Sequence, residues 1–240
     1  MFNAQPIQLR HEAIFIKELT IGEIMQIAKI PEALNEMRIS SFISFATKDN
    51  TLAGRLTVQE RYFILLNWLA ISDSAYSMDG DTSEYFIAEN KNIPDFFETE
   101  GVYTHHLLGQ HVSALQRKCE NAYEWLTCQM ACQLSGDMTA IFSSELPIIW
   151  APLTSDNDNE IDEVITQRFT EIEALTDGQF NKLYQIFAMG THHLRHLVDI
   201  SLDNKGITLA KGGDGEYEAV RFRPLAGVSD IARQLAECFA

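Results

Sequence analysis

The sequence has no long run of predominantly apolar residues. The longest, YFILLNWLAI at 62–71, has about ten residues, whereas a helix that spans a bilayer needs about 20. The N-terminus, MFNAQPIQLRHEAIFI, also lacks the basic segment and continuous apolar segment of a secretory signal. The sequence therefore predicts no membrane span and synthesis in a reducing cytoplasm.

Basic residues are scarce as well. Lysine and arginine total 18 against 34 aspartate and glutamate residues, which gives a formal net charge of −16 and a pI near 4.7. Nucleic-acid binding relies on the neutralisation of phosphates by lysine and arginine, and an acidic surface repels anionic lipids. We therefore expect neither nucleic acid nor an anionic membrane as a partner.

The four cysteines form no CxxC motif: they are Cys119, Cys128, Cys132 and Cys238. A structural zinc site usually uses that spacing, and a reducing compartment disfavours disulfides. Cys128 and Cys132 are four residues apart, which would place them on one face of a helix. We interpret them as small buried helix residues, with half of a zinc site as the alternative.

Motifs of nucleophilic enzymes and nucleotide sites are absent too. The sequence contains no GxSxG, and the glycines of AKGGDGEYEAV match neither phosphate-loop pattern. The acidic stretches SMDGDTSEYF and TSDNDNEIDEVI lack the glycine and final glutamate of an EF-hand loop. We expect no cofactor, and we interpret these three segments as a hairpin turn and two solvated loops.

Most of the recognisable local patterns in the sequence are helix signals. In LTIGEIMQIAKIPE, Thr20 is a candidate N-cap and Glu23 follows three residues later, as a capping box requires. RLTVQERYFILLNWLA at 55–70 repeats the pattern with Thr57 and Glu60, and an apolar stripe follows. These patterns predict helices that begin just after Thr20 and Thr57.

The predicted fold class is mainly α with minor β. A strand within 7–19 and the helices after it form an N-terminal helical unit, residues 1–71. Residues 72–102 are acidic and rich in turn formers, which indicates a hairpin or an irregular excursion. The remainder, 103–240, is predicted as a helical body with a β-hairpin at 206–225.

Further elements are expected inside these parts. A second N-terminal helix is expected at 32–47 and a short strand at 84–88. A long helix pair is expected at 103–135, followed by helices at 160–175 and 177–202. Gly212, Gly213 and Gly215 are the expected turn of the hairpin, and a last helix begins at about 228.

Six of the seven histidines lie in two similar stretches, THHLLGQH at 104–111 and THHLRHL at 191–197. On a helix, His192 and His196 would share a face at the spacing of HExxH zinc helices. In that motif the residue after the first histidine is the glutamate base, and here it is His193. A metallohydrolase would therefore lack its base, and its third ligand would have to be Asp199 or a residue of the first stretch.

The first stretch offers little to such a site. His105, His106 and His111 contain no pair three or four residues apart, so a single helix would separate their side chains. We predict no metal site and interpret both stretches as helix residues at buried contacts. His192 and His196 remain the metal-site candidates if this interpretation fails.

The segment IFIKELTIGEIMQIAKIPEALNEMRISSFISFAT resembles the start of small proteins of tailed bacteriophages, namely tail assembly chaperones and baseplate-hub-associated proteins. The shared features are a short β entry, an LT-x-x-E/D helix start, a break at a proline and a second LT-x-x-E helix, here LTVQERYFILLNWLA. The resemblance covers about the first 70 residues. It implies a tail component and identifies no catalytic residue.

The expected function is therefore that of a non-enzymatic structural or assembly protein of a phage tail. The chain is longer than the chaperones, which favours a baseplate component of the virion that packs in several symmetry-related copies against other tail proteins. Two alternatives stay open. One is a cytosolic metal-dependent enzyme that uses His192 and His196, and the other is an acidic adaptor that binds a host protein.

Overall fold

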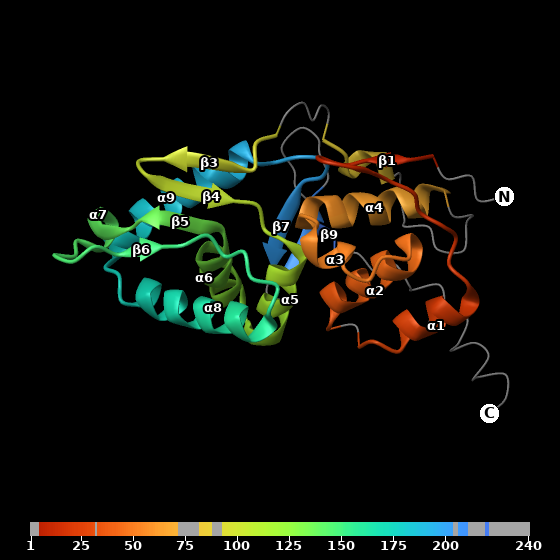
Figure 1. Cartoon of the computed structure of the whole chain (residues 1–240), viewed down its shortest axis with the longest axis horizontal. Coiled ribbons are helices and arrows are strands. Elements are labelled where there is room, and N and C mark those ends of the chain that lie inside the picture. Colours follow the sequence, from red (N-terminus) through yellow and green to blue (C-terminus); the bar gives the residue numbers. More distant parts are fainter. Residues whose placement is uncertain are drawn as a thin grey trace. The chain divides into compact units, whose positions relative to one another are not determined.

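The computed structural model describes residues 5–31, 33–71, 82–87, 93–203, 206–210 and 219–220 (Figure 1). Helices predominate and the strands are short, so the predicted class, mainly α with minor β, is confirmed. The described residues fall into two compact units. Unit 1 contains the described residues up to 87 together with 197–201, 207–210 and 219–220, and unit 2 contains 93–196, 202–203 and 206.

This division differs from the expected parts 1–71, 72–102 and 103–240. Residues 197–201 belong to unit 1 because they pair with the segment that follows its helices. The Ile87 amide donates to the Leu197 carbonyl at 3.0 Å, and Phe86 forms a β-bridge with Val198. Part of the predicted C-terminal body therefore folds with the N-terminal unit.

Unit 1 opens with a small hairpin and continues as helices. Strands β1 (Ile7–Gln8) and β2 (Ala13–Ile14) pair antiparallel, where the sequence predicts a single strand. The helices that follow are α1 (Ile21–Ala28), α2 (Asn35–Thr47), α3 (Leu52–Arg55), α4 (Val58–Ile71) and the 3₁₀ helix η1 (Thr82–Tyr85). Residues 84–85 therefore belong to a 3₁₀ turn and not to the expected short strand.

Both predicted capping boxes are present. At α1, the Thr20 hydroxyl accepts from the Glu23 amide at 3.3 Å and the Glu23 carboxylate accepts from the Thr20 amide at 2.8 Å. Thr57 and Glu60 make the same reciprocal pair at α4, at 3.1 Å and 3.0 Å. Each pair satisfies two amides that would otherwise lack an intrahelical partner.

Unit 1 buries an ion pair between α2 and α4. The Arg61 Nη2 lies 3.2 Å from a Glu36 carboxylate oxygen, and both side chains are almost completely shielded from solvent. The same nitrogen donates to the Glu36 carbonyl at 2.8 Å and to the Ser40 hydroxyl at 3.0 Å. The Tyr62 hydroxyl donates to Glu36 at 2.6 Å. These bonds compensate part of the desolvation cost of two buried charges.

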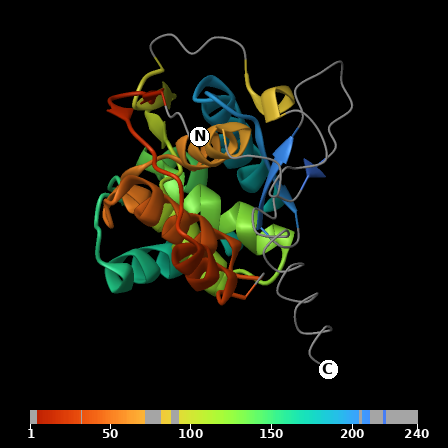
Figure 2. The same cartoon turned by 90° about the vertical axis from the view of Figure 1, so that its right-hand side faces the viewer.

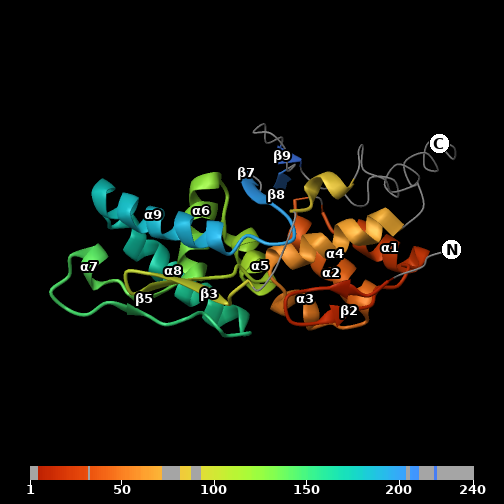
Figure 3. The ribbon, with the colours of Figure 1, turned by 90° about the horizontal axis from the view of Figure 1, so that it is seen from above.

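Unit 2 is built on an antiparallel sheet with the strand order β3 (Phe96–Thr99), β4 (Val102–His105), β5 (Leu134–Asp137) and β6 (Ile149–Trp150). Its helices are α5 (Gly109–Lys118), α6 (Ala122–Gln133), α7 (Thr139–Phe142), α8 (Asp158–Glu173) and α9 (Asp177–His193). Figure 3 shows α9 and α6 on the same side of the sheet. The sheet therefore packs its helices on one face.

The core of unit 2 lies between the sheet and α6, α8 and α9. It contains eleven buried residues: Val102, Met130, Ala131, Leu134, Met138, Ile141, Trp150, Ile172, Leu183, Ile186 and Phe187. The contact of α9 with β4 is close, because a Cβ at Gly190 would lie 2.4 Å from Thr104 Cβ. Glycine is thus required at this crossing.

A buried arginine connects α8 to the rest of unit 2. The Arg168 Nη1 donates to the Ala131 carbonyl at 2.8 Å and to the Leu134 carbonyl at 3.1 Å, at the C-terminal end of α6. Its guanidinium lies 5.0 Å from the centre of the Trp150 ring. The side chain therefore satisfies helix-end carbonyls that α6 cannot satisfy itself.

Two predicted helices end or begin differently from the expectation. The predicted pair 103–135 starts as strand β4, and only α5 and α6 are helical. The predicted helix 177–202 ends at His193, where the Leu194 amide closes the last turn, and Ile200–Asp203 form strand β7. Tertiary pairing in the two sheets overrides the local helix pattern at both places.

The predicted C-terminal hairpin pairs as expected where it is described. Strand β8 (Gly206–Ala210) pairs antiparallel with β9 (Ala219–Val220), with Leu209 opposite Val220. Together with β7 they form a sheet with the order β7-β8-β9, whose strands are drawn in blue in Figure 2. The turn glycines Gly212, Gly213 and Gly215, the expected last helix and Cys238 lie outside the described residues.

Candidate functional site

The structure does not place the two metal-site candidates on one helical face. His192 is exposed near the end of α9, which ends at His193, and His196 lies three residues beyond that end and is buried. The Leu194 amide turns back to the Gly190 carbonyl at 3.0 Å and closes the helix. Because the helix ends between them, the spacing of four residues does not place His192 and His196 on the same side.

One histidine from each stretch does meet its counterpart. The rings of His106 and His196 lie edge to face with centres 4.9 Å apart, and both side chains are buried. His106 Nε2 donates to the Pro94 carbonyl at 2.9 Å, and His196 Nδ1 donates to the Leu194 carbonyl at 2.8 Å. Because a carbonyl only accepts, each of these nitrogens carries a proton, and in the neutral ring the other nitrogen, His106 Nδ1 or His196 Nε2, is an acceptor.

The remaining histidine of α9 also makes a packing contact. The ring of His193 stacks on Phe97 of β3 with centres 4.1 Å apart. Among residues 5–31, 33–71, 82–87, 93–203 and 206–210, no group of three or more histidine, cysteine, aspartate or glutamate side chains is placed to hold a metal ion. His106, His193 and His196 are thus placed in ring contacts.

His105 and Ser135 form the pair that most resembles a catalytic arrangement. His105 Nε2 lies 2.7 Å from the Ser135 hydroxyl, within the distance of a nucleophile and its base. Burial, followed by the charge of Arg168, lowers the pKa of His105. Ser135, however, lies within a strand and is only 2% exposed, so a substrate carbonyl has no route to its oxygen. The pair satisfies two polar groups inside the sheet.

The third histidine of the first stretch is a core residue. His111 lies in the first turn of α5, is 2% exposed, and its Nδ1 accepts from the Leu108 amide at 3.4 Å. Burial lowers the pKa of His111 to about 4. It is therefore neutral at physiological pH and contributes no charge to a binding site.

Three of the four cysteines are described, and all three are free thiols. Cys128 and Cys132 are buried in α6. A hydrogen bond from the Cys119 thiol to the Cys128 sulfur raises the pKa of Cys119 and lowers that of Cys128. Burial raises the pKa of the Cys132 thiol. These cysteines fill space between helices, in line with the interpretation as small buried residues.

The most distinctive surface of unit 2 is the face of its sheet that is turned away from α9. In antiparallel pairing, opposite residues share a face, and the register pairs Phe96 with His105, Glu98 with Tyr103, Tyr103 with Ser135 and Asp137 with Ile149. The residues of this outer face are Phe96, Glu98, Tyr103, His105, Ser135, Asp137 and Ile149. Figures 1 and 3 show no helix of unit 2 on this side.

Apolar and aromatic side chains on the outer face are exposed to solvent. Phe96 is 48%, Tyr103 37% and Ile149 63% exposed. The Phe96 ring contacts Tyr103 edge-on, with centres 5.4 Å apart, and lies 6.0 Å from His105. The alternate residues Val102, Leu134 and Trp150 are buried in the core on the other side. The outer face therefore presents a small aromatic surface that the unit does not cover.

The charges of the outer face are acidic. Glu98 accepts a hydrogen bond from the Gly101 amide at 2.8 Å, and Asp137 accepts from the Thr139 amide at 2.9 Å. Bonds from the Thr139 hydroxyl and amide lower the pKa of Asp137. Neither Glu98 nor Asp137 forms an ion pair with another residue of the described part. Both carboxylates remain available to an incoming cation.

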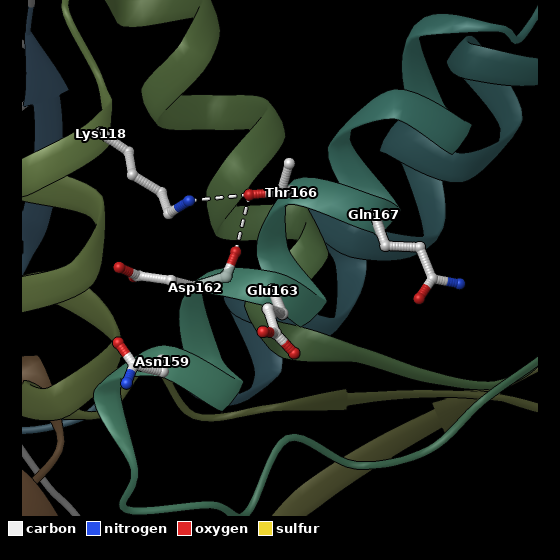
Figure 4. A pocket seen from close by; sticks show the side chains of 6 residues that line it. All are labelled: Lys118, Asn159, Asp162, Glu163, Thr166 and Gln167. Atoms are coloured by element: carbon white, nitrogen blue, oxygen red, sulfur yellow. Dashed lines mark hydrogen bonds between the residues drawn. The ribbon is translucent and has the colours of Figure 1, made fainter.

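Unit 2 also carries an open pocket of about 580 Å³ on the surface of α8 (Figure 4). It is lined by Lys118, Asn159, Asp162, Glu163, Thr166 and Gln167. The Lys118 ammonium donates to the Thr166 hydroxyl at 2.7 Å, and that hydroxyl donates to the Asp162 carbonyl at 2.7 Å. All six lining residues are polar or charged, and no aromatic or large aliphatic side chain is among them, which is unlike typical small-molecule sites.

Unit 1 has an exposed apolar ridge of its own. Ile21 and Met25 lie one turn apart on α1 and are more than half exposed, while Ile24 and Ile27 face the core. Residues four apart on a helix lie on the same face. Helix α1 is therefore apolar toward solvent as well as toward its unit.

Sequence reasoning missed the outer face because it assigned residues from 103 onward to a helix. The signal was present in FFETEGVYTH, where two four-residue segments flank Glu100 and Gly101. Both of these residues have positive φ, +53° and +80°. Two such residues form the tight turn that joins antiparallel strands. A period of two on each side of this turn would have indicated Phe96 and Tyr103 as partners on one face.

Comparisons with protein-family models, with curated proteins and with solved structures find no match to this chain. Within the part of the chain that the structure describes, no helix has both the length and the apolar character needed to cross a membrane.

Proposed function

We propose that this chain is a non-enzymatic structural or assembly protein of a bacteriophage tail, and that it acts in the baseplate by packing against other tail proteins. The observation that carries the proposal is the outer face of the unit 2 sheet, which exposes Phe96, Tyr103 and Ile149. Exposed apolar groups of this kind typically mark contact surfaces for proteins. The resemblance of the N-terminal part to tail assembly and baseplate-hub-associated proteins directs the proposal to a phage tail.

Unit 1 supports the same proposal in a second way. Ile21 and Met25 form an exposed ridge on α1, within the segment that carries the resemblance. Aromatic residues and methionine are enriched in protein interfaces, and charged residues are depleted from interface cores. Each unit thus offers an apolar surface, and a tail component that lies between neighbours in several symmetry-related copies needs more than one such surface.

The experiment is the analysis of purified virions and tail assembly intermediates by mass spectrometry. A baseplate component is expected in both, at a constant ratio to the other tail proteins. Presence in intermediates alone identifies a transient assembly chaperone and corrects the baseplate assignment. Absence from both preparations, while the chain is present in the infected cell, refutes the proposed function.

A matched pair of variants connects this experiment to the structure. Met25→Gln changes an exposed side chain of the α1 ridge. Gln26→Ala changes its exposed neighbour, which lies off the line of Ile21 and Met25. If the ridge is a packing surface, Met25→Gln lowers incorporation into particles and Gln26→Ala does not. Equal incorporation of both variants assigns no assembly role to the ridge.

A further inference from the structure

The outer face of the unit 2 sheet is arranged in three rows across the strands. The first row holds Phe96 and His105, and the second holds Glu98, Tyr103 and Ser135. The third holds Asp137 and Ile149. Aromatic rings therefore lie in the first and second rows, with Glu98 beside Tyr103 and Asp137 in the third row.

The dimensions of the sheet determine the separation of the two carboxylates. Glu98 on β3 and Asp137 on β5 are two strands apart and one row apart, which places their Cα atoms about 12 Å from each other. Alternate residues on one side of an extended segment are about 7 Å apart, and every second one about 13 Å. Two positive side chains four residues apart in an extended segment therefore match the separation of Glu98 and Asp137, and a segment with arginine at alternate positions contains such pairs.

The charges of the outer face determine the sign of the charge that a binding partner must carry. Its carboxylates accept hydrogen bonds only from backbone or hydroxyl groups of the turn residues that follow them. His105 has a pKa below its usual value because it is buried, so it adds no positive charge at neutral pH. The chain as a whole carries a formal charge of −16. A second copy would bring like charges together, which disfavours self-association through this face.

We propose that the outer face binds an arginine-bearing segment of a partner protein, whose guanidinium groups pair with Glu98 and Asp137 and stack on Phe96 and Tyr103. Arginine suits both tasks, because its planar group bonds to carboxylates through two nitrogens and lies flat against aromatic rings. The identification of the partner as another tail protein rests on the proposed function. The chemistry of the contact rests on the face itself.

The test uses the purified full chain and a fluorescently labelled short peptide of alternating arginine and threonine residues. Fluorescence anisotropy is expected to show saturable binding that weakens as salt is raised, because screening reduces charge pairing. The same peptide with lysine in place of arginine is expected to bind about threefold or more weakly, since lysine forms neither the forked bond nor the stack. Equal binding of the two peptides contradicts the proposal.

Matched variants separate the outer face from the acidic surface in general. Tyr103→Ser on β4 is expected to weaken peptide binding about tenfold. Tyr184→Ser is the control, because Tyr184 is similarly exposed, at 41%, but lies on α9 at the opposite side of the sheet. The control variant is expected to bind within about twofold of the unchanged chain.

The carboxylates are tested with variants that keep their oxygen acceptors. Glu98→Gln and Asp137→Asn together retain the hydrogen bonds to the turn amides, so the turns stay intact. Their expected effect is a loss of about tenfold in affinity. Glu163→Gln on α8 is the control for charge alone. This pair of variants also decides the matter if Tyr103→Ser fails to fold.

Three results overturn the inference. They are an absence of peptide binding, an equal loss of affinity in the outer-face and control variants, and a dimer of the chain that Tyr103→Ser dissociates in analytical ultracentrifugation. The last result would make a second copy the occupant. If the peptide does not bind but the chain is found in virions, the inference about the outer face is refuted and the proposed tail function stands. Absence from virions, with peptide binding through Tyr103, refutes only the phage assignment.

Discussion

The two units of this protein differ in how they compensate a buried arginine and in which apolar groups they expose. Unit 1 buries a complete ion pair, Glu36 with Arg61, among hydrogen bonds from its helices. Unit 2 buries Arg168 without a carboxylate partner among its described residues, against the carbonyls of Ala131 and Leu134, and leaves Phe96, Tyr103 and Ile149 exposed on the open face of its sheet. A buried ion pair contributes little net stability but penalises alternative packings. Exposed aromatic groups are available for binding.

The comparison indicates which positions in each unit tolerate substitution. In unit 1 the sensitive positions lie inside, at the contact of α2 with α4. In unit 2 the outer face can change with little effect on folding, while its opposite face cannot. Four predictions test this contrast, from the largest expected effect to the smallest.

The largest effect is expected at the buried ion pair. Arg61→Ala leaves Glu36 charged and buried, which is expected to lower the free energy of unfolding of unit 1 by about 3–5 kcal/mol. Denaturant titration measures this loss, and hydrogen exchange locates it. The double variant Glu36→Leu with Arg61→Met is the companion, since replacement of both charges by apolar groups is expected to restore most of the stability. A single variant that unfolds at the same denaturant concentration as the unchanged chain contradicts the prediction.

The next effect depends on pH and concerns unit 2. Burial lowers the pKa of His111 from 6.5 to about 4. The unfolded chain therefore binds a proton more readily than the folded chain, so stability is fully present above about pH 6.5 and is lost as the pH falls toward about 4. The expected loss across this window is about 3 kcal/mol.

Thermal unfolding as a function of pH measures this contribution. His111→Gln is the matched variant, because glutamine is polar but does not titrate, and its unfolding should lose the part of the pH dependence between those values. An unchanged pH profile in the variant would assign the acid sensitivity to other groups.

A smaller effect is expected where α9 crosses the sheet. Gly190→Ala brings a Cβ to 2.4 Å from Thr104 Cβ, so the helix must move away from β4. Overpacking of this kind costs about 1–3 kcal/mol. Denaturant titration should show the loss, and adding Thr104→Ala should recover part of it because the Thr104 hydroxyl and methyl are removed. Gly178→Ala, at the exposed start of the same helix, has open space around the new Cβ and should not destabilise the chain.

The smallest effect on stability is expected from the removal of metal ions. Because no three histidine, cysteine, aspartate or glutamate side chains of the described residues are grouped to hold a metal ion, a chelator is expected to leave the melting temperature unchanged within about 1 °C, and purified protein should contain less than about a tenth of an equivalent of zinc, iron or manganese. Elemental analysis and a thermal shift assay provide the measurements. A stoichiometric metal that His192→Ala or His196→Ala removes would revive the metal-dependent enzyme and refute this interpretation of the histidines.

Local signals predicted local structure well. The capping pairs Thr20 with Glu23 and Thr57 with Glu60 depend only on residues three apart, so the sequence contained everything needed to place the starts of α1 and α4. The mainly helical class followed from the same patterns. The start of β4 and the end of α9 were missed, because these depend on pairing partners far away in the chain.

The histidine stretches show the same limit. Their likeness in sequence suggested two halves of one site, and the structure brings only His106 and His196 together, through ring packing. The helix spacing of His192 and His196 was not realised because α9 ends at His193. Whether residues four apart share a helical face depends on where the helix ends, and α9 ends before His196.

By itself, the sequence determined the acidic charge, the helix starts and the dominance of helices, since each depends on composition or on near neighbours along the chain. Only the tertiary structure decided which residues share the outer face of the sheet and which histidines meet. The physical reason is that strand register joins residues far apart in sequence. A shift of the register by one position would turn Phe96 and Tyr103 from solvent into the core.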